Sequence, residues 1–348
     1  MAWNLLTKRR DDLPEMRWPL VVLTMAVTCL AGGGALALWE AAPVLTIPFL
    51  VLAVVSYTLL ILLWRRLAAL AVSAGVGAFV ILSGGGWFPA VCCALSLLAV
   101  AYVYATLFIA RESRFVRIAS TASAIGVCLL LTAIAWISWR FGTVGEAVRY
   151  FYEVYRDAAG AGLQSLYASG DPEAAVILLP ETISAMLGQV VVTVPALAGM
   201  ACILLAGVCD GLIRFLFWLL DCSEYFAADG DDGITIPRSF GVMYGTLLFL
   251  VMSTNAAGAP HLYSILSNCH WIFALPCAWV GLCVGYRKLR MRLAEASLYG
   301  SARTHSPLPT ILLMLFIILL LGLSAAFTLL AVLGAVCIIG RKPAKREE

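Results

Sequence analysis

Two charged side chains lie inside an apolar stretch of this chain, and they are the first candidates for chemistry. Asp210 and Arg214 are four residues apart with the acid first, the favourable order for an ion pair along a helix. A charge at the centre of a bilayer costs about 2.5–3.5 kcal/mol on insertion scales, which makes the pair a candidate solute site. The alternative is structural, because both lie toward one end of the stretch, where Arg214 can extend to water. We favour the structural alternative.

Three further polar residues, Asn255, Asn268 and His270, lie in or beside the apolar stretches that follow. With Asp210 and Arg214 they form the candidate set for a site that binds a solute or packs helices together. Asn268 and His270, near the outer end of a predicted span, could line a polar cavity. We favour an interfacial hydrogen-bonding role for His270, because such positions are already in contact with water.

The histidines predict no metal site. His261, His270 and His305 have no His or Cys partner at ligand spacing, except that Cys269 stands beside His270. Adjacent residues on a helix point in different directions, so this pair does not form a ligand set. No cofactor is expected either.

The acidic segment 229–233, with sequence DGDDG, resembles part of a calcium loop but does not complete one. An EF-hand loop needs Gly at its sixth position and Glu at its twelfth, where this chain has Ile234 and Phe240. No G-x-S-x-G, H-E-x-x-H or phosphate-binding glycine loop occurs. We therefore predict a solvated acidic turn and a protein that is not an enzyme.

The composition fits a lipid bilayer. Hydrophobic residues make up 62% of the 348 positions and charged residues 12%, about half the charged share of an average soluble domain. The net charge of +3 and the short, dispersed basic clusters exclude a nucleic-acid partner. The 11 cysteines form no C-x-x-C pair and are expected to pack as small hydrophobic residues.

Stretches without Asp, Glu, Lys or Arg predict the membrane spans, since a span needs about 20 apolar residues to cross a hydrocarbon core of about 30 Å. These stretches are 18–39, 41–64, 67–110, 118–139, 182–209, 239–286 and 304–340. The third and the sixth are too long for one helix and are divided by turns at 83–89 and 255–261. We predict an all-α, polytopic transmembrane bundle of about eight or nine spans. The number depends on whether 304–340 forms one long tilted helix, which we favour, or a hairpin.

Basic residues orient the chain. Clusters of Lys and Arg precede the first predicted span and follow the second, the fourth and the eighth, whereas the short loops around Glu40, Gly85 and Gly258 carry none. The positive-inside rule then places the amino terminus in the cytoplasm of a multi-pass cell-membrane protein. The basic carboxyl tail fits this rule only if the last segment is a hairpin, so its side stays open.

Polar segments divide the chain into three parts. Between 144 and 166 apolar residues recur at helical spacing with charged residues between them, which predicts an external amphipathic helix on the bilayer surface. We expect a five-span bundle at 1–140, this external segment at 141–188, and the remaining spans at 189–348. Three glycine pairs at i, i+4 favour close helix packing; they are Gly207 and Gly211, Gly241 and Gly245, and Gly281 and Gly285.

The order of these features resembles the YybS-like family of bacterial membrane proteins, a domain family of unknown function. The resemblance is carried by the proline-bounded span at 43–50, the proline-containing span at 194–197, the loop-to-span entry at 236–237 and the close at 340–342. Residues 336–339 lack the acidic residue that is usual there in the family. The first half of that family is similar to the substrate-binding components of energy-coupling-factor vitamin transporters, so the resemblance implies a helical bundle that holds a small solute.

Two functions from different classes follow. The first is a transport-related membrane protein that binds a small-molecule solute, which the uncharged span interiors and the resemblance favour. The second is a noncatalytic scaffold or envelope-assembly protein that binds a membrane-protein partner, which the external helix and the acidic loop at 221–238 favour. The lipid bilayer is the expected partner in both.

Overall fold

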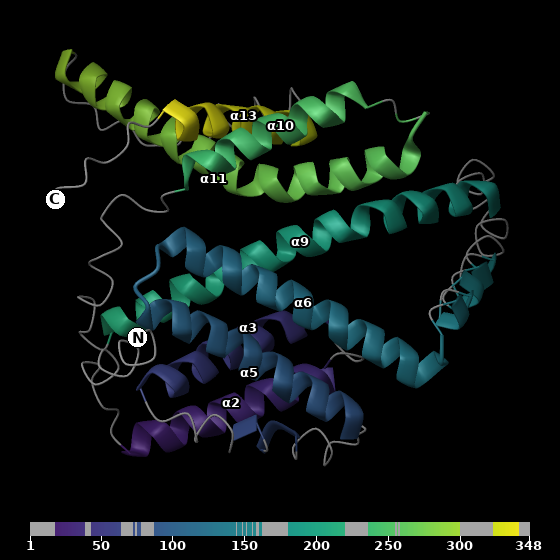
Figure 1. Cartoon of the computed structure of the whole chain (residues 1–348). Coiled ribbons are helices and arrows are strands. Elements are labelled where there is room, and N and C mark those ends of the chain that lie inside the picture. Colours follow the sequence, from purple (N-terminus) through teal and green to yellow (C-terminus); the bar gives the residue numbers. More distant parts are fainter. Residues whose placement is uncertain are drawn as a thin grey trace. The chain divides into compact units, whose positions relative to one another are not determined.

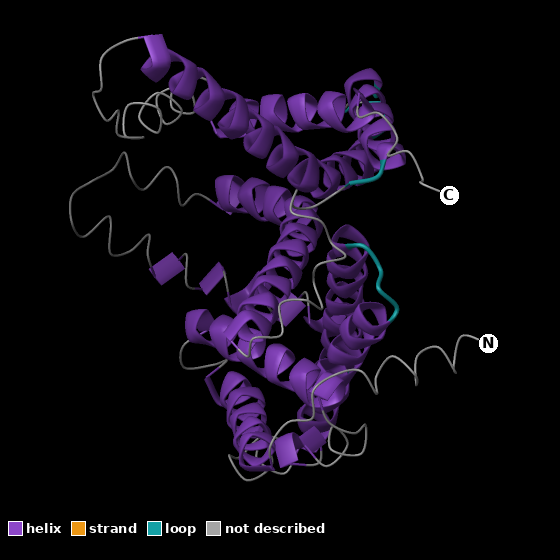
Figure 2. Ribbon diagram, turned by 90° about the vertical axis from the view of Figure 1, so that its left-hand side faces the viewer, coloured by secondary structure: helices purple, strands orange, loops and turns teal. Residues whose placement is uncertain are grey.

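In the computed structural model of the chain, all regular secondary structure of the described residues is helical (Figure 1). The structure describes residues 18–38, 43–63, 72–73, 75–77, 87–143, 145–147, 149–150, 152–154, 156–157, 160–161, 180–219, 236–254, 256, 258–299 and 323–340. The principal helices are α2 (Trp18–Leu38), α3 (Pro43–Leu63), α5 (Trp87–Ile109), α6 (Arg114–Phe141), α9 (Pro180–Leu219), α10 (Arg238–Ser253), α11 (Pro260–Tyr299) and α13 (Leu323–Gly340). Figure 2 shows the same helices from a second direction.

Four of the described helices are long and apolar enough to cross a membrane. They contain the stretches Val91–Ile109, Arg114–Phe141, Val192–Leu219 and Pro260–Lys288. Four shorter apolar helices accompany them: Val21–Ala35, Thr46–Leu62, Arg238–Ser253 and Ala325–Gly340. The apolar helices therefore indicate a helical membrane protein, with four candidate spans in the described residues where the sequence predicts about eight or nine.

The chain forms two compact units. The first comprises Met1–Val191 with Ala201–Gly233, and the second comprises Val192–Met200 with Ile234–Glu348. Helix α9 supplies residues to both. The parts predicted at 1–140, 141–188 and 189–348 differ from this division, because residues 201–233, which the sequence analysis placed in the third part, group with the first unit.

The first unit is built on helices α2, α3, α5 and α6, which are apolar on most of their faces. Helix α2 packs against α3, α3 against α5, and α5 against α6. Their buried side chains form one continuous core that also includes Cys209, Ile213 and Phe217 of α9. These three residues are spaced at i, i+4 and i+8, so they form one stripe along α9.

The turn between α5 and α6 is fixed by backbone hydrogen bonds. The Glu112 N–H donates to the Leu107 carbonyl and the Arg111 N–H donates to the Phe108 carbonyl, both at 3.1 Å. Arg111 has a φ of 60°. This combination is a Schellman motif, in which a left-handed residue ends one helix and redirects the chain. Helix α6 starts directly afterwards, with Ser113 as its N-cap.

The second unit contains α10, α11 and α13, and each of the three packs against the other two. A Cβ atom added at Gly281 of α11 would overlap the Leu330 carbonyl oxygen of α13, and one added at Gly334 of α13 would overlap the Cys277 carbonyl oxygen of α11. The backbones of α11 and α13 therefore approach as closely as small-residue helix pairs allow.

The structure confirms one predicted helix boundary and corrects another. The turn predicted at 255–261 is confirmed, since α10 ends at Ser253 and α11 begins at Pro260. The span predicted at 182–209 is too short, because α9 continues to Leu219. The charge-free stretch ends before Asp210, but a charged residue does not interrupt an α-helix, and the Asp210 carboxylate is paired here with Arg114, Arg117 and Arg214.

The external amphipathic helix was predicted at 144–166. The described residues between 145 and 161 are helical, and of those with an assigned exposure Ala147 alone is buried. Arg149 and Glu153 form an exposed i, i+4 ion pair there at 3.1 Å. The acidic turn at 229–233, His305, residues 304–322 and the basic tail lie outside the described residues.

Candidate functional site

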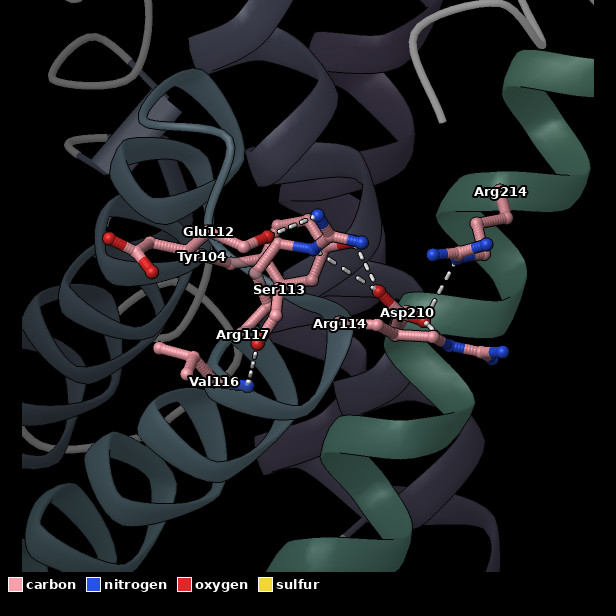
Figure 3. A network of polar contacts seen from close by, with 8 residues as sticks. All are labelled: Tyr104, Glu112, Ser113, Arg114, Val116, Arg117, Asp210 and Arg214. Carbon is pink, nitrogen blue, oxygen red and sulfur yellow. Dashed lines mark hydrogen bonds and ion pairs between the residues drawn. The ribbon is translucent and has the colours of Figure 1, made fainter. Parts of the chain in front are cut away.

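The first candidate site surrounds the Asp210 carboxylate, which has no exposed surface. Tyr104 of α5 donates its hydroxyl to Asp210 Oδ1 at 2.8 Å. Arg114 of α6 and Arg214 of α9 donate their Nε–H groups to Asp210 Oδ2 at 2.8 Å and 3.2 Å. Arg117 Nε lies 3.7 Å from Oδ1. Figure 3 shows these side chains meeting at one aspartate from three helices, and we call them the Asp210 cluster.

Arg117 is the most buried of the three arginines, with 3% of its side chain exposed. Its Nη1 donates to the Glu112 backbone carbonyl at 2.9 Å, and its guanidinium carbon lies 5.8 Å from the centre of the Phe108 ring. The Schellman turn presents this carbonyl to the guanidinium, since Glu112 lies within the turn. Local backbone geometry therefore orients Arg117 toward α9.

Arg114 and Arg214 are about a quarter exposed, at 24% and 23% of their side chains. Arg114 is the first residue of α6, and Ser113 caps this helix by accepting the Val116 N–H at 3.4 Å. Arg214 follows Asp210 by one helical turn. The cluster thus runs from a buried centre at Asp210 and Arg117 to two partly exposed guanidinium groups.

The arrangement joins three helices. Both Asp210 oxygens accept hydrogen bonds, and the donors come from α5, α6 and α9. Removal of one partner from a buried ion pair typically costs about 3–5 kcal/mol. The Asp210 cluster therefore holds α5, α6 and α9 together through one buried carboxylate.

The i, i+4 ion pair of Asp210 with Arg214 is present as the sequence suggests. Sequence reasoning missed Tyr104, Arg114 and Arg117, because the loop arginines were used only to orient the chain. A signal was available in the acidic residue isolated within an apolar helix, since a buried carboxylate needs more than one donor.

The second candidate site lies in the second unit, where Asn268 of α11 contacts the backbone of α9. Its Oδ1 accepts the Ala196 N–H at 3.1 Å, and its Nδ2 donates to the Val192 carbonyl at 2.7 Å. Nδ2 also donates to the Ser264 carbonyl of its own helix at 2.9 Å. These bonds use both amide hydrogens, so Asn268 serves helix packing. Asn255, its companion in the sequence analysis, lies outside the described residues.

His270 occupies a different environment from the one that we predicted. It was expected at a wet interface, but it is 6% exposed and its ring stacks on that of Tyr244, with centroids 5.3 Å apart. Within the described part of the chain, neither His270 Nδ1 nor Tyr244 Oη has a hydrogen-bond partner. The rings of Tyr244 and Trp271, which both contact His270, explain the difference because they exclude water from it.

Of the glycines in the predicted pairs, some lie against a neighbouring helix and others have free space where a Cβ would be. Gly281 meets α13, and a Cβ at Gly241 would lie 3.1–3.2 Å from Ile338, Ile339 and the Ala335 carbonyl. At Gly207, Gly211, Gly245 and Gly285 a Cβ would meet no atom within 4 Å. Sequence reasoning missed Gly199, where a Cβ would lie 2.6 Å from Ile272 Cδ1, and Gly334, because neither has a second glycine four residues away.

In the residues that the structure describes, no group of three or more His, Cys, Asp or Glu side chains could hold a metal ion. No family model, curated protein or solved structure matches this chain.

Proposed function

We propose that this protein is a multi-pass membrane protein that binds a small solute and takes part in its transport. The observation that carries the proposal is the complete burial of Asp210 within an apolar helix, held by donors from three helices. Ionisable groups at membrane depth are costly and typically mark solute or ion pathways. Apolar side chains of similar volume often pack as stably as a buried ion pair, so packing alone gives little reason for these charges.

The Asp210 cluster supplies an element that can exist in two arrangements. Arg114 and Arg117 belong to α6 and Arg214 belongs to α9, with the Asp210 carboxylate in contact with all three. While the carboxylate remains between them, it offsets the repulsion among the three positive groups. If these contacts are broken, like charges face one another and favour separation of α6 from α9. A solute that binds one arrangement more tightly shifts the population toward it.

The resemblance to the YybS-like family also supports a solute-binding role, through that family's similarity to vitamin-binding transport components. This part of the proposal is an analogy at the level of the fold and does not name a solute.

The proposal is tested by thermal unfolding of the purified full chain in detergent with a panel of vitamins and metabolites. A compound that binds the folded protein raises Tm in proportion to the logarithm of its concentration above Kd. Uptake of that compound into proteoliposomes is then compared for the wild type, Asp210→Asn and the control Asp157→Asn, whose ion pair with Arg156 is exposed. We expect uptake to be lost only in Asp210→Asn. A flat response to the whole panel contradicts solute binding.

A second candidate is a membrane scaffold, which the described helical residues between 145 and 161 favour. The side chains of Tyr150, Tyr152 and Val154 are about half exposed, which suits a partner surface. Crosslinking in membranes followed by purification tests this role. Recovery of one stoichiometric membrane-protein partner, together with a flat response to the solute panel, would replace the transport proposal by the scaffold.

A further inference from the structure

The two oxygens of the Asp210 carboxylate contact different groups. Tyr104 and Arg117 lie at Oδ1, whereas Arg114 and Arg214 both donate Nε–H to Oδ2, at 2.8 Å and 3.2 Å. Figure 3 shows the guanidinium groups of Arg114 and Arg214 on the same side of the carboxylate. Both side chains are about a quarter exposed. The Oδ2 side of the Asp210 cluster therefore presents two neighbouring cations to the surroundings.

Arg114 retains donors for a further acceptor. Its Nε–H donates to Asp210, and it makes no other hydrogen bond within the described residues. An arginine has five N–H donors, so those on the Nη atoms of Arg114 have no acceptor there. Arg111 and Glu112, both exposed in the adjoining turn, carry opposite charges and offset one another. A ligand of Arg114 must therefore be an acceptor, and the positive charge of the guanidinium favours an anion.

The neighbouring position of Arg214 also favours an anion. Two guanidinium groups that contact one oxygen repel each other, and Asp210 offsets this repulsion on their inner side only. A second anion on the outer side would offset it further. Phosphate suits this position, since a guanidinium matches two of its oxygens with paired N–H donors.

The two arginines lie near the ends of candidate membrane spans. One span ends at Ile109, and the next begins at Arg114 itself. Arg214 precedes Leu219, where a third span ends, by about 7 Å along the helix at 1.5 Å per residue. Lipid headgroups occupy a layer of about 5–8 Å on each side of the hydrocarbon core. Both guanidinium groups are therefore near the depth of the lipid phosphates.

We propose that Arg114 and Arg214 bind the phosphate of an anionic phospholipid at this end of the first unit. Basic sites between transmembrane helices are known to bind anionic headgroups. A zwitterionic lipid also has a phosphate, but its ammonium group would add a third cation beside the two arginines. The inference goes beyond solute transport, because it concerns the lipid that surrounds the Asp210 cluster.

The exposed apolar surface of α6 favours a lipid over a free phosphate ion. Val127, Leu130 and Leu131 are 55%, 61% and 60% exposed along the helix that Arg114 begins. Acyl chains can cover such a surface while the headgroup contacts the arginines, and each buried CH₂ group contributes about 0.8 kcal/mol. A free phosphate would have the hydrogen bonds alone.

The test measures Tm of the delipidated full chain in a neutral detergent. Three titrations are compared: phosphatidylglycerol, phosphatidylcholine with the same acyl chains, and inorganic phosphate. We expect a saturable rise in Tm with phosphatidylglycerol and a much smaller one with the other two. An equal rise with phosphatidylcholine overturns the selection for an anionic headgroup. An equal rise with inorganic phosphate assigns the arginines to a free ion and overturns the lipid.

Variants locate the effect at Arg114. Arg114→Gln should raise the phosphatidylglycerol concentration at half of the Tm rise at least about tenfold, the effect of losing a hydrogen bond to a charged group. Arg149→Gln, at a side chain 81% exposed and paired with Glu153, is the matched control and should leave it unchanged. Arg114→Lys keeps a cation beside Asp210 without the planar fork, so its midpoint should lie between the wild type and Arg114→Gln.

Native mass spectrometry provides a measurement that does not depend on Tm, since Arg114→Gln also removes a partner of Asp210 and lowers stability without lipid. The wild type and Arg149→Gln should retain phosphatidylglycerol that Arg114→Gln and, in part, Arg114→Lys lose. Equal retention in all four proteins overturns the proposal. That result would leave the response to the solute panel unaffected, so the proposed transport function is judged separately.

Discussion

Asn268 bridges Val192 and Ala196, the acceptor and the donor that an undistorted α-helix would pair with each other. Its Oδ1 accepts the Ala196 N–H at 3.1 Å and its Nδ2 donates to the Val192 carbonyl at 2.7 Å. Pro195 stands between them and has no N–H to donate, so the helical ladder is already weakened there. A side chain that enters the ladder is a recognised cause of helix distortion. Asn268 therefore stabilises α9 at its weakest point and fixes α11 against it.

The first prediction concerns this bridge. Asn268→Leu keeps the volume of the side chain and removes its polar atoms, so it should lower the free energy of unfolding by about 1–2 kcal/mol, the range for interhelical hydrogen bonds in membranes. Thermal unfolding in detergent measures the loss. Cys269→Ala, at a partly buried neighbour, is the control. Equal stability of the two variants would show that the backbone of α9 does not need the amide.

The second prediction concerns the centre of the Asp210 cluster. Asp210→Asn preserves the shape of the side chain but leaves Arg117 buried without its ion pair, so the free energy of unfolding should fall by about 3–5 kcal/mol. Asp157→Asn breaks an exposed ion pair, whose carboxylate is 73% exposed, and should cost less than about 1 kcal/mol. Chemical unfolding in mixed micelles compares both with the wild type. Similar losses in the two variants would contradict the burial argument.

The third prediction separates the hydroxyl of Tyr104 from its ring. Tyr104→Phe keeps the buried ring and removes the donor to Asp210 at 2.8 Å. A hydrogen bond to a charged group contributes about 1.5–3 kcal/mol, so a loss of this size in unfolding free energy is expected. Tyr152→Phe, at a side chain 50% exposed, should be neutral. In the Asp210→Asn background Tyr104→Phe should cost less, since the acceptor is then an uncharged amide.

The sequence was sufficient to predict most helices, because charge and proline mark their ends. Helix α2 at Trp18–Leu38 and α3 at Pro43–Leu63 follow the charge-free stretches at 18–39 and 41–64 closely. The same rule failed at Asp210, where the helix continues through the charge. A charge marks the end of a span only when it is solvated. Local sequence could not show that Asp210 is paired, because two of its three arginine partners belong to α6, about 100 residues earlier.

The polar groups of the second unit were harder to assign from sequence. Asn268 and His270 are two residues apart, yet Asn268 contacts α9 and His270 stacks on Tyr244 of α10. Positions i and i+2 on a helix point to different sides, so their roles separate even when their sequence context is shared. Which neighbour each side meets depends on helix packing, and local sequence carries little information about it.

The last prediction uses two glycines on the same face of α11. A Cβ at Gly281 would overlap the Leu330 carbonyl oxygen and lie 3.1 Å from Gly334 N, whereas a Cβ at Gly285 would meet no atom within 4 Å. Backbone atoms cannot turn aside as a flexible side chain does, so Gly281→Ala must separate α11 from α13, at a cost of about 1–3 kcal/mol for overpacking.

The two substitutions should therefore have opposite signs. Gly285→Ala adds the same methyl group in open space and replaces a poor helix former, which should raise the free energy of unfolding by up to about 1 kcal/mol. Thermal unfolding of both variants in the same detergent measures the difference. Because helix propensity changes equally in both, an equal gain would show that α11 and α13 are not in backbone contact, and the close approach at Gly281 and Gly334 would be wrong.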